Sequence, residues 1–309
     1  MAGEMKEFLM LRYSLIEEEQ QSSIAERVPT PKGRAIVRAI ESDREFVSGR
    51  AKYGFVGFRQ VHPSLRDDFA QERFYVGKIA KLKQVHRGTK VPGDIIETTE
   101  DDWVPLLTVI DTETQHIIVR KDWRFGNPEQ TIRIIQDGLR DPILAHYNHR
   151  VFVEGKTKVK HFWSVVESHR KIYNLEIKLI SPNILETNRS ARDALAALKD
   201  LFRQDELAIR LRSEAGDLSV PKAPLDSYLE YIEEGEGTWS VTTEGVSGGK
   251  KKHSSSDSID VLFLPVPETP GEEDGQMQLG EIESPIQRLS YEAALVAMVL
   301  DEVRPSRER

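Results

Sequence analysis

The chain has 309 residues, of which 30% are charged and 39% hydrophobic, and its formal net charge at pH 7 is −8. This length allows one large domain or two ordinary ones, and the absence of cysteine excludes disulfides, thiol nucleophiles and cysteine-ligated zinc. The longest apolar runs, such as residues 293–300, are too short to cross a bilayer, and the acidic start is unlike a signal peptide. We therefore expect a cytoplasmic protein without a membrane partner.

The first part of the chain, residues 1–115, predicts a mainly antiparallel β region. Its strand-like segments combine apolar alternation with short continuous apolar runs. We expect strands at residues 8–16, 53–59, 74–83 and 104–111. A further run at 115–120 follows the last of these after a short polar turn, which is a hairpin pattern.

Residues 116–264 form the second predicted region, in which strand-like and helix-like runs alternate. Such alternation is typical of a sheet covered by helices. The strands are expected at residues 116–122, 150–154, 175–180 and 207–212, with helices between them, and a fourth helix follows near 225–232. The first helix begins at Asn127-Pro128, a cap followed by a first-turn proline, and the third is expected at 190–202.

The C-terminal part is expected to be less regular. Residues 244–258 have the composition of a flexible loop, and a buried strand is expected at 259–265. Residues 265–284 indicate a flexible acidic linker, and 285–309 contain a helix that is apolar on two sides. We interpret this helix as a docking or oligomerisation helix, although packing against its own domain is an equally good interpretation. The whole pattern predicts an α+β protein: a mainly antiparallel N-terminal β region, a helix-covered mixed sheet and an appended C-terminal helix.

The charge is unevenly distributed. Residues 223–309 hold 18 acidic and 7 basic residues, a balance of −11, which leaves +3 for residues 1–222. An acidic tail can mask a basic surface or repel nucleic acid, and it can also simply be solvated.

The most enzyme-like motif is Glu176-x-Lys178 on a predicted strand. Alternation places both side chains on one face, as a metal-dependent nuclease needs: the carboxylate binds a divalent cation and the lysine neutralises developing charge. Asp111 or Asp122 is the upstream acid that would complete the site. The ordinary alternative is a polar strand face, and in that case no cofactor or metal is expected.

Basic residues gather more clearly than catalytic ones. The candidate cluster lies on the outward faces of two predicted strands, 175–180 and 207–212, and around the start of the second predicted helix. Such a cluster can neutralise phosphates without reading bases, and its alternative is a solvated face crossed by salt bridges. The candidate nucleic-acid-binding residues are Lys156, Lys158, Lys160, Lys178, Arg210 and Arg212.

The middle third of the chain resembles known proteins. The Phe152-Val153-Glu154-Gly155 strand, the Phe162-Trp163 helix and the run Leu175-Glu176-Ile177-Lys178 with Pro182-Asn183 resemble uncharacterised proteins of bacterial phage-defence loci. The segments 212–218 and 218–221 are similar to the phage-exclusion A proteins of Rex systems. This resemblance implies a prophage or defence-island protein that is a homodimer and contacts DNA. It supplies no catalytic residues.

Three hypotheses follow. The first is a non-enzymatic binding component of a bacterial anti-phage system, which contacts nucleic-acid phosphates and a protein partner. In this hypothesis the partner, or a second copy, contacts the C-terminal helix. The second hypothesis is a metal-dependent nuclease that uses Asp111, Glu176 and Lys178. The third is an acidic protein-interaction scaffold.

Overall fold

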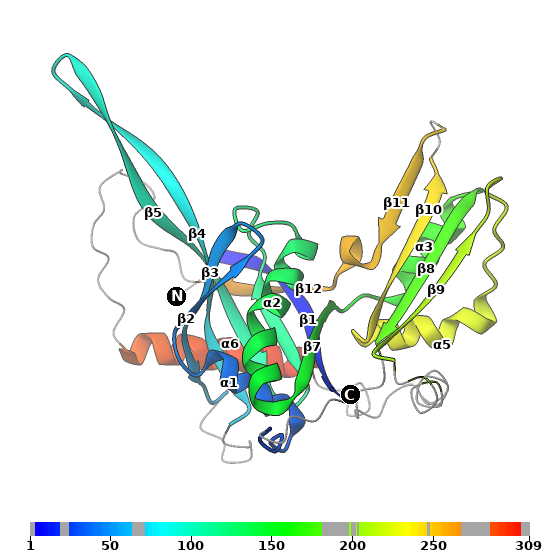
Figure 1. Cartoon of the computed structure of the whole chain (residues 1–309), viewed down its shortest axis with the longest axis horizontal. Helices are drawn as coiled ribbons and strands as arrows, with labels where there is room; N and C mark the ends of the chain where they lie inside the picture. The colour runs from blue at the N-terminus through cyan, green and yellow to red at the C-terminus, as the bar shows by residue number, and fades with distance from the viewer. Residues whose placement is uncertain are drawn as a thin grey trace.

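The computed structural model describes residues 4–18, 25–63, 72–180, 198, 202, 204–245, 248–266 and 285–303. Over these residues the fold is α+β, as predicted, with one eight-stranded and one four-stranded sheet. Each sheet with its helices forms a lobe, and Figure 1 shows the large lobe beside the small one. Within the described ranges, no helix is long and apolar enough to cross a membrane.

The large lobe is built on the eight-stranded sheet. Its strands are β1 (Glu4–Glu17), β2 (Arg44–Ser48), β3 (Ala51–Gln60), β4 (Phe74–Val91), β5 (Asp94–Asp111), β6 (His116–Arg120), β7 (His149–Gly155) and β12 (Val261–Val266). They lie in the order β12-β1-β6-β5-β4-β3-β2, and β7 also pairs with β1. β12 pairs with the first half of β1 and β7 with the second half, so both complete the same edge of that strand.

Helices cover both faces of this sheet. One face carries η1 (Lys32–Ile36), α1 (Val37–Ile40) and α2 (Pro128–Tyr147), and the other carries α6 (Pro285–Val303). In β6, Ile117 and Val119 belong to the first core and Ile118 to the second, and all three are fully buried. Burial on both faces explains why β1 and β6 are nearly continuous apolar runs in the sequence.

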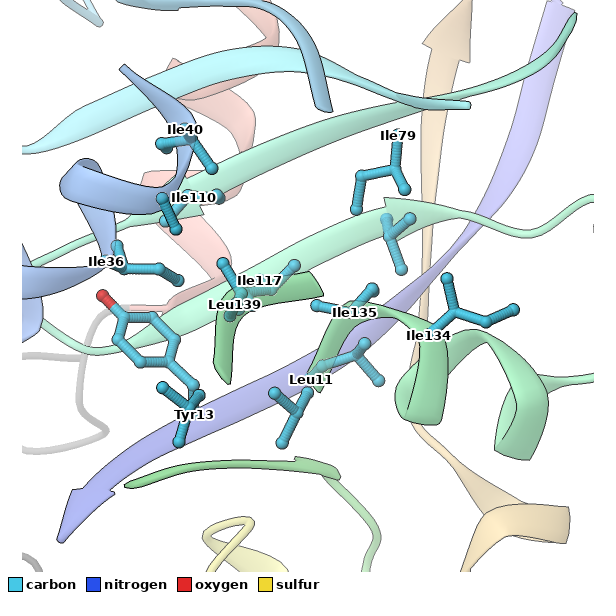
Figure 2. Close-up of a cluster of buried hydrophobic side chains, with 14 of the residues drawn as sticks. Leu11, Tyr13, Ile36, Ile40, Ile79, Ile110, Ile117, Ile134, Ile135 and Leu139 are labelled. Carbon is cyan, nitrogen blue, oxygen red and sulfur yellow. The ribbon is translucent and has the colours of Figure 1, made fainter. Parts of the chain in front are cut away.

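The core between the sheet and α2 is drawn in Figure 2, where side chains of the helix and of the strands below it meet. Ile135 and Leu139 of α2 lie against Leu11 of β1 and Ile117 of β6. These four side chains are at most 1% exposed. Ile135 and Leu139 are four residues apart in α2 and lie on the same face of the helix, which packs on inward-facing side chains of the strands.

The ends and the packing of α2 follow from its sequence. Asn127 caps the helix by accepting a hydrogen bond from the Gln130 amide, and the Gln130 side chain returns a bond to the cap, which confirms the predicted start. Gly138 lets the helix approach the sheet closely, because a Cβ there would lie 2.5 Å from the ring of Phe46.

The small lobe is a four-stranded sheet with helices on one face. Its strands are β8 (Ile172–Ile180), β9 (Glu206–Arg212), β10 (Gly237–Glu244) and β11 (Lys250–Ser254), in the order β11-β10-β8-β9. α3 (Val159–Ser168) and α5 (Lys222–Glu233) cover its inner face. The core between them contains Phe162, Trp163, Leu175, Ile177, Leu179, Leu229, Trp239 and Val241. The opposite, outer face is not covered by α3 or α5.

Two segments of chain connect the lobes: one leads from β7 to α3, and the other from η2 (Ser255–Ser258) to β12. They run side by side, and the Asp260 amide donates to the Lys156 carbonyl at 2.8 Å. Arg12 of β1 spans the junction. Its guanidinium donates to the Glu234 carbonyl at 2.7 Å and pairs with the buried Glu236 carboxylate at 2.9 Å. This buried pair connects the large-lobe sheet to the turn after α5.

The predicted organisation needs three corrections. The sheet of the second region is not mixed, because every pairing between strands of the described chain is antiparallel. The expected region 116–264 does not coincide with one sheet either, because β6 and β7 pair with β1 in the large lobe. Apolar periodicity identifies a strand, but it does not identify the strand with which it pairs.

The third correction concerns residues 244–264. The segment expected to be a flexible loop contains β11 and η2. The strand expected to be buried is β12, an edge strand of the large lobe, with Val261 37% and Phe263 59% exposed. Both features depend on distant partners, β10 for β11 and β1 for β12.

The C-terminal helix is present as α6 and lies on its own sheet. Leu295, Val296 and Val299 are buried against residues of β1, β4 and β6, whereas Met298 remains 41% exposed. Of the two interpretations of this helix, packing against its own domain accounts for these buried residues. The expected helix at 190–202 falls outside the described residues except for 198 and 202, which are helical, and 267–284 of the expected linker also fall outside them.

Candidate nucleic-acid interface

The candidate interface is the outer face of the small-lobe sheet. The inner face takes Leu175, Ile177 and Leu179 of β8 into the core, so the alternate residues of this strand point outward. A row of directly paired residues crosses all four strands on that outer face. It consists of Arg212, Asn174, Thr242 and Lys252. The row has a cation at each end, two neutral hydrogen-bonding side chains between them and no carboxylate.

The neighbouring rows carry compensated charge. Arg210 pairs with Glu176 at 2.9 Å, and Lys178 pairs with Glu206 at 3.6 Å. The cationic side chains of these pairs are exposed, Arg210 at 66% and Lys178 at 45%. Both ion pairs are therefore weak, and their cations can contact other groups. Among the residues described, Arg212, which is exposed, has no carboxylate partner within 4 Å. Lys252 at the other end of the row is also exposed and has no carboxylate within 4 Å among the residues described, so positive charge is uncompensated at both ends.

A hollow of ≈ 500 Å³ extends along this face, with lining residues from all four strands of the sheet. Its wall includes Tyr173, Asn174, Arg212, Thr242 and Lys250. The remaining lining residues are Arg210, Ser213 and Glu214, so the lining is polar, with three cations and one carboxylate. Its net positive charge suits an anionic group rather than an apolar ligand.

Tyr173 in this hollow is held by polar contacts. Its hydroxyl donates to the Glu244 carboxylate, and the Lys250 ammonium lies 3.8 Å from the centre of its ring. The hydrogen bond from Tyr173, followed by that from Lys171, lowers the pKa of Glu244, and the hydrogen bond to Glu244 raises the pKa of Tyr173. A ring covered by a cation is not available for stacking on a base.

The other predicted basic residues lie elsewhere. Lys156 belongs to the lobe junction, where burial and then the nearby Arg12 lower its pKa. Lys158 lies 3.6 Å from Asp260, and the exposed Lys160 is on α3, which covers the inner face of the sheet. The predicted set therefore does not form one surface: Lys178, Arg210 and Arg212 come together on the outer face, and the three residues 156, 158 and 160 do not.

The nuclease hypothesis is not supported by the geometry. Glu176 and Lys178 share the outer face of β8, as predicted, but both candidate acids belong to the other lobe. Asp111 ends β5, and Asp122 follows β6 and pairs with Arg124 at 2.8 Å. The Asp111 carboxylate is fully buried and accepts two hydrogen bonds from Arg73, at 3.0 and 2.7 Å. It also accepts from the Thr114 hydroxyl, so it holds the turn after β5 instead of facing a substrate. No group of three metal-ligating side chains is found in the described part of the chain.

Sequence reasoning missed the basic residues of β11. Lys250 and Lys252 lie in the segment expected to be a flexible loop, and both are exposed. A signal for this strand exists in the preceding residues: β10 alternates buried Trp239 and Val241 with polar residues, and glycines follow it. An alternating strand followed by a glycine-rich turn is typical of a hairpin.

Comparisons of the chain with models of protein families, with curated proteins and with solved structures find no match. The function of this chain is therefore inferred from the residues and geometry of the site.

Proposed function

We propose that this chain is a non-enzymatic nucleic-acid-binding protein, which contacts phosphates with the outer face of its small-lobe sheet. The single observation behind this proposal is the row of Arg212, Asn174, Thr242 and Lys252, which contains two cations and no carboxylate. Following the resemblance in the middle of the sequence, we propose a bacterial anti-phage system as its setting.

The spacing of this row suits separated phosphates. Neighbouring strands lie about 4.8 Å apart, so the strands of Arg212 and Lys252, three intervals apart, are separated by about 14 Å. This separation between the two strands is similar to the width of the major groove of duplex DNA, which is about 12 Å. Long, flexible arginine and lysine side chains adjust to either side of such a groove, and Asn174 and Thr242 supply hydrogen bonds between them.

The composition of the face favours contact with the backbone over recognition of bases. The aromatic ring in the hollow, that of Tyr173, is covered by Lys250. Single-stranded nucleic acids are usually bound by stacking of bases on exposed aromatic rings. We therefore expect little sequence preference and a strong dependence on salt.

The test is binding of labelled duplex DNA and duplex RNA, measured by fluorescence anisotropy with the whole chain at low ionic strength. The double variant Arg212→Glu with Lys252→Glu removes the two cations of the row. The matched control, Lys158→Glu with Lys160→Glu, changes the net charge by the same amount on the other side of the lobe.

We expect the first variant to lose at least about tenfold in affinity and the control to change little. All four residues are exposed, so we expect both variants to retain the fold. Thermal unfolding of each variant checks this. Equal losses in the two variants, or no binding by the original chain at low salt, would contradict the proposal.

A further inference from the structure

The outer half of the β4–β5 hairpin, residues 84–103, is exposed along almost its whole length, and we call it the acidic arm. It was not anticipated from the sequence, in which the two strands were expected to end at residue 83 and to begin at 104. The strands instead continue through a turn at Pro92-Gly93, and Figure 1 shows the hairpin projecting from the large lobe.

Among the described residues, no other strand pairs with the arm. β3 pairs with β4 only as far as Lys81, and β6 pairs with β5 only up to Thr108. In the described part of the chain, both outer edges of the arm therefore lack a strand partner. Ile95 and Ile96 near its tip are 63% and 52% exposed. An isolated two-stranded ribbon is marginally stable, and unpaired strand edges with exposed apolar residues favour contact with another chain.

The charge of the arm indicates the kind of surface it contacts. It carries five acidic residues and two basic ones, a balance of −3. Arg87 lies 3.5 Å from Glu100, but Glu97, Asp101 and Asp102 have no cationic partner within 4 Å among the described residues. A nucleic acid would be repelled by this surface, whereas a basic protein surface would be attracted.

The molecule itself contains a basic surface of this kind, the outer face of the small lobe. Its row ends in Arg212 and Lys252, with the further exposed cation Lys250 beside it. In Figure 1 the arm points away from the small lobe, and it continues the strands of the large-lobe sheet. The arm therefore does not reach the basic face of its own chain.

We propose that the acidic arm docks on the basic outer face of the small lobe of a second copy of this chain. Each copy carries both surfaces, and in the proposed closed pair the arm of each copy lies on the basic face of the other. Because the arm and nucleic-acid phosphates would contact the same cations, nucleic acid and self-association exclude each other. The proposal uses the face assigned to the proposed function, but it does not require that nucleic acid binds there.

The first measurement is the mass of the whole chain by sedimentation equilibrium without nucleic acid, at about 50 mM and about 500 mM salt, since screening weakens contacts between exposed charges. We expect a pair at low salt and a shift towards the single chain at high salt. The arm variant, Glu97→Lys with Asp101→Lys, should associate at least about tenfold more weakly. The control, Glu17→Lys with Glu302→Lys, changes two exposed acids of the large lobe and should associate like the original chain.

A charge exchange makes the test specific. The arm variant and the face variant Arg212→Glu with Lys252→Glu should each be single chains alone, and an equimolar mixture of the two should form a pair. In the mixture both contacts again join opposite charges. A chain that is single at every concentration, or a pair that survives reversal of the arm, would overturn the proposal, as would a mixture that stays single.

Failure of this inference is distinguishable from failure of the proposed function. The arm variant retains the basic face, so it should bind duplex DNA at least as tightly as the original chain. Because pairing covers the basic face, the decisive chain is the arm variant. If the original chain pairs but the single-chain arm variant does not bind duplex DNA, the inference stands and the proposed function is removed. Nucleic-acid binding by a chain that never pairs would do the reverse.

Discussion

The two lobes use their sheets in different ways. The large lobe buries both faces of its sheet, under α2 on one side and α6 on the other, and its strands contain runs such as Ile117, Ile118 and Val119 with no exposed surface. The small lobe buries one face under α3 and α5 and presents a charged face outward. A sheet with two apolar faces contributes mainly stability, whereas a sheet with one polar face also provides a flat surface for binding.

The largest expected effect is a loss of stability in the large lobe. Phe8 is fully buried between the sheet and α6, so Phe8→Ala should lower the free energy of unfolding by about 3–5 kcal/mol. Thr242→Ala on the outer face of the small lobe should change it by less than about 0.5 kcal/mol. Urea unfolding followed by circular dichroism measures both. Similar values for the two variants would remove the distinction between the lobes.

A smaller loss is expected at the end of β5. Asp111→Asn weakens two charged hydrogen bonds with Arg73, and should lower the free energy of unfolding by about 1.5–3 kcal/mol. The same denaturation experiment applies. If Asp111 were instead a metal-binding catalytic residue, the change would abolish divalent-metal-dependent cleavage of nucleic acid and leave stability nearly unaffected.

The junction between the lobes should respond to pH. Burial, with a contribution from Glu206 in the small lobe, raises the pKa of the Glu154 carboxyl from 4.5 to about 7. Between these two values the folded chain holds a proton that the unfolded chain has released, so the contribution of Glu154 to stability falls as pH rises through this interval and is constant above it.

Glu154→Gln is a neutral replacement of similar shape and should remove this part of the pH dependence. Urea unfolding of both chains at about pH 5 and about pH 8 gives the comparison. We expect the stability difference between original and variant to favour the original more at the lower pH. An identical pH profile for the two chains would show that Glu154 ionises normally in the folded state.

The smallest expected effect concerns the exposed pairs of the small lobe. Arg210 is 66% exposed and pairs with Glu176 at 2.9 Å, so Glu176→Gln should change the free energy of unfolding by less than about 1 kcal/mol. The same change frees Arg210 from its carboxylate, and nucleic-acid affinity should rise slightly. Weaker binding in this variant would indicate that Glu176 takes part in the contact.

The sequence predicts the elements of this protein better than their partners. Strands with a buried face, such as β1 and β6, and helices with a clear cap, such as α2, follow from apolar spacing and from Asn127. The acidic arm does not, because both of its faces are exposed and its residues lack alternation. Ile95 and Ile96 are its only aliphatic pair, and two adjacent apolar residues define no face.

The candidate site is predictable in part for the same reason. In both β8 and β9, apolar and polar residues alternate. Once these two strands pair, the alternation places Lys178, Arg210 and Arg212 on the same face of the sheet. Lys252 reaches the same face because β11 pairs with β10 in one particular register. Three consecutive lysines in the sequence do not show which of them points outward. Asp111 was grouped with Glu176 because spacing along the chain does not show that β5 and β8 belong to different sheets.

The most direct test of the proposed phosphate-binding face is the salt dependence of duplex DNA binding. The logarithm of the observed association constant is measured against the logarithm of salt concentration, for the original chain and for Arg212→Gln with Lys252→Gln. If both cations contact phosphates, the variant should have a slope smaller in magnitude by about 2, because each contact releases about one counterion. An unchanged slope would place the contacts elsewhere on the molecule and contradict the account.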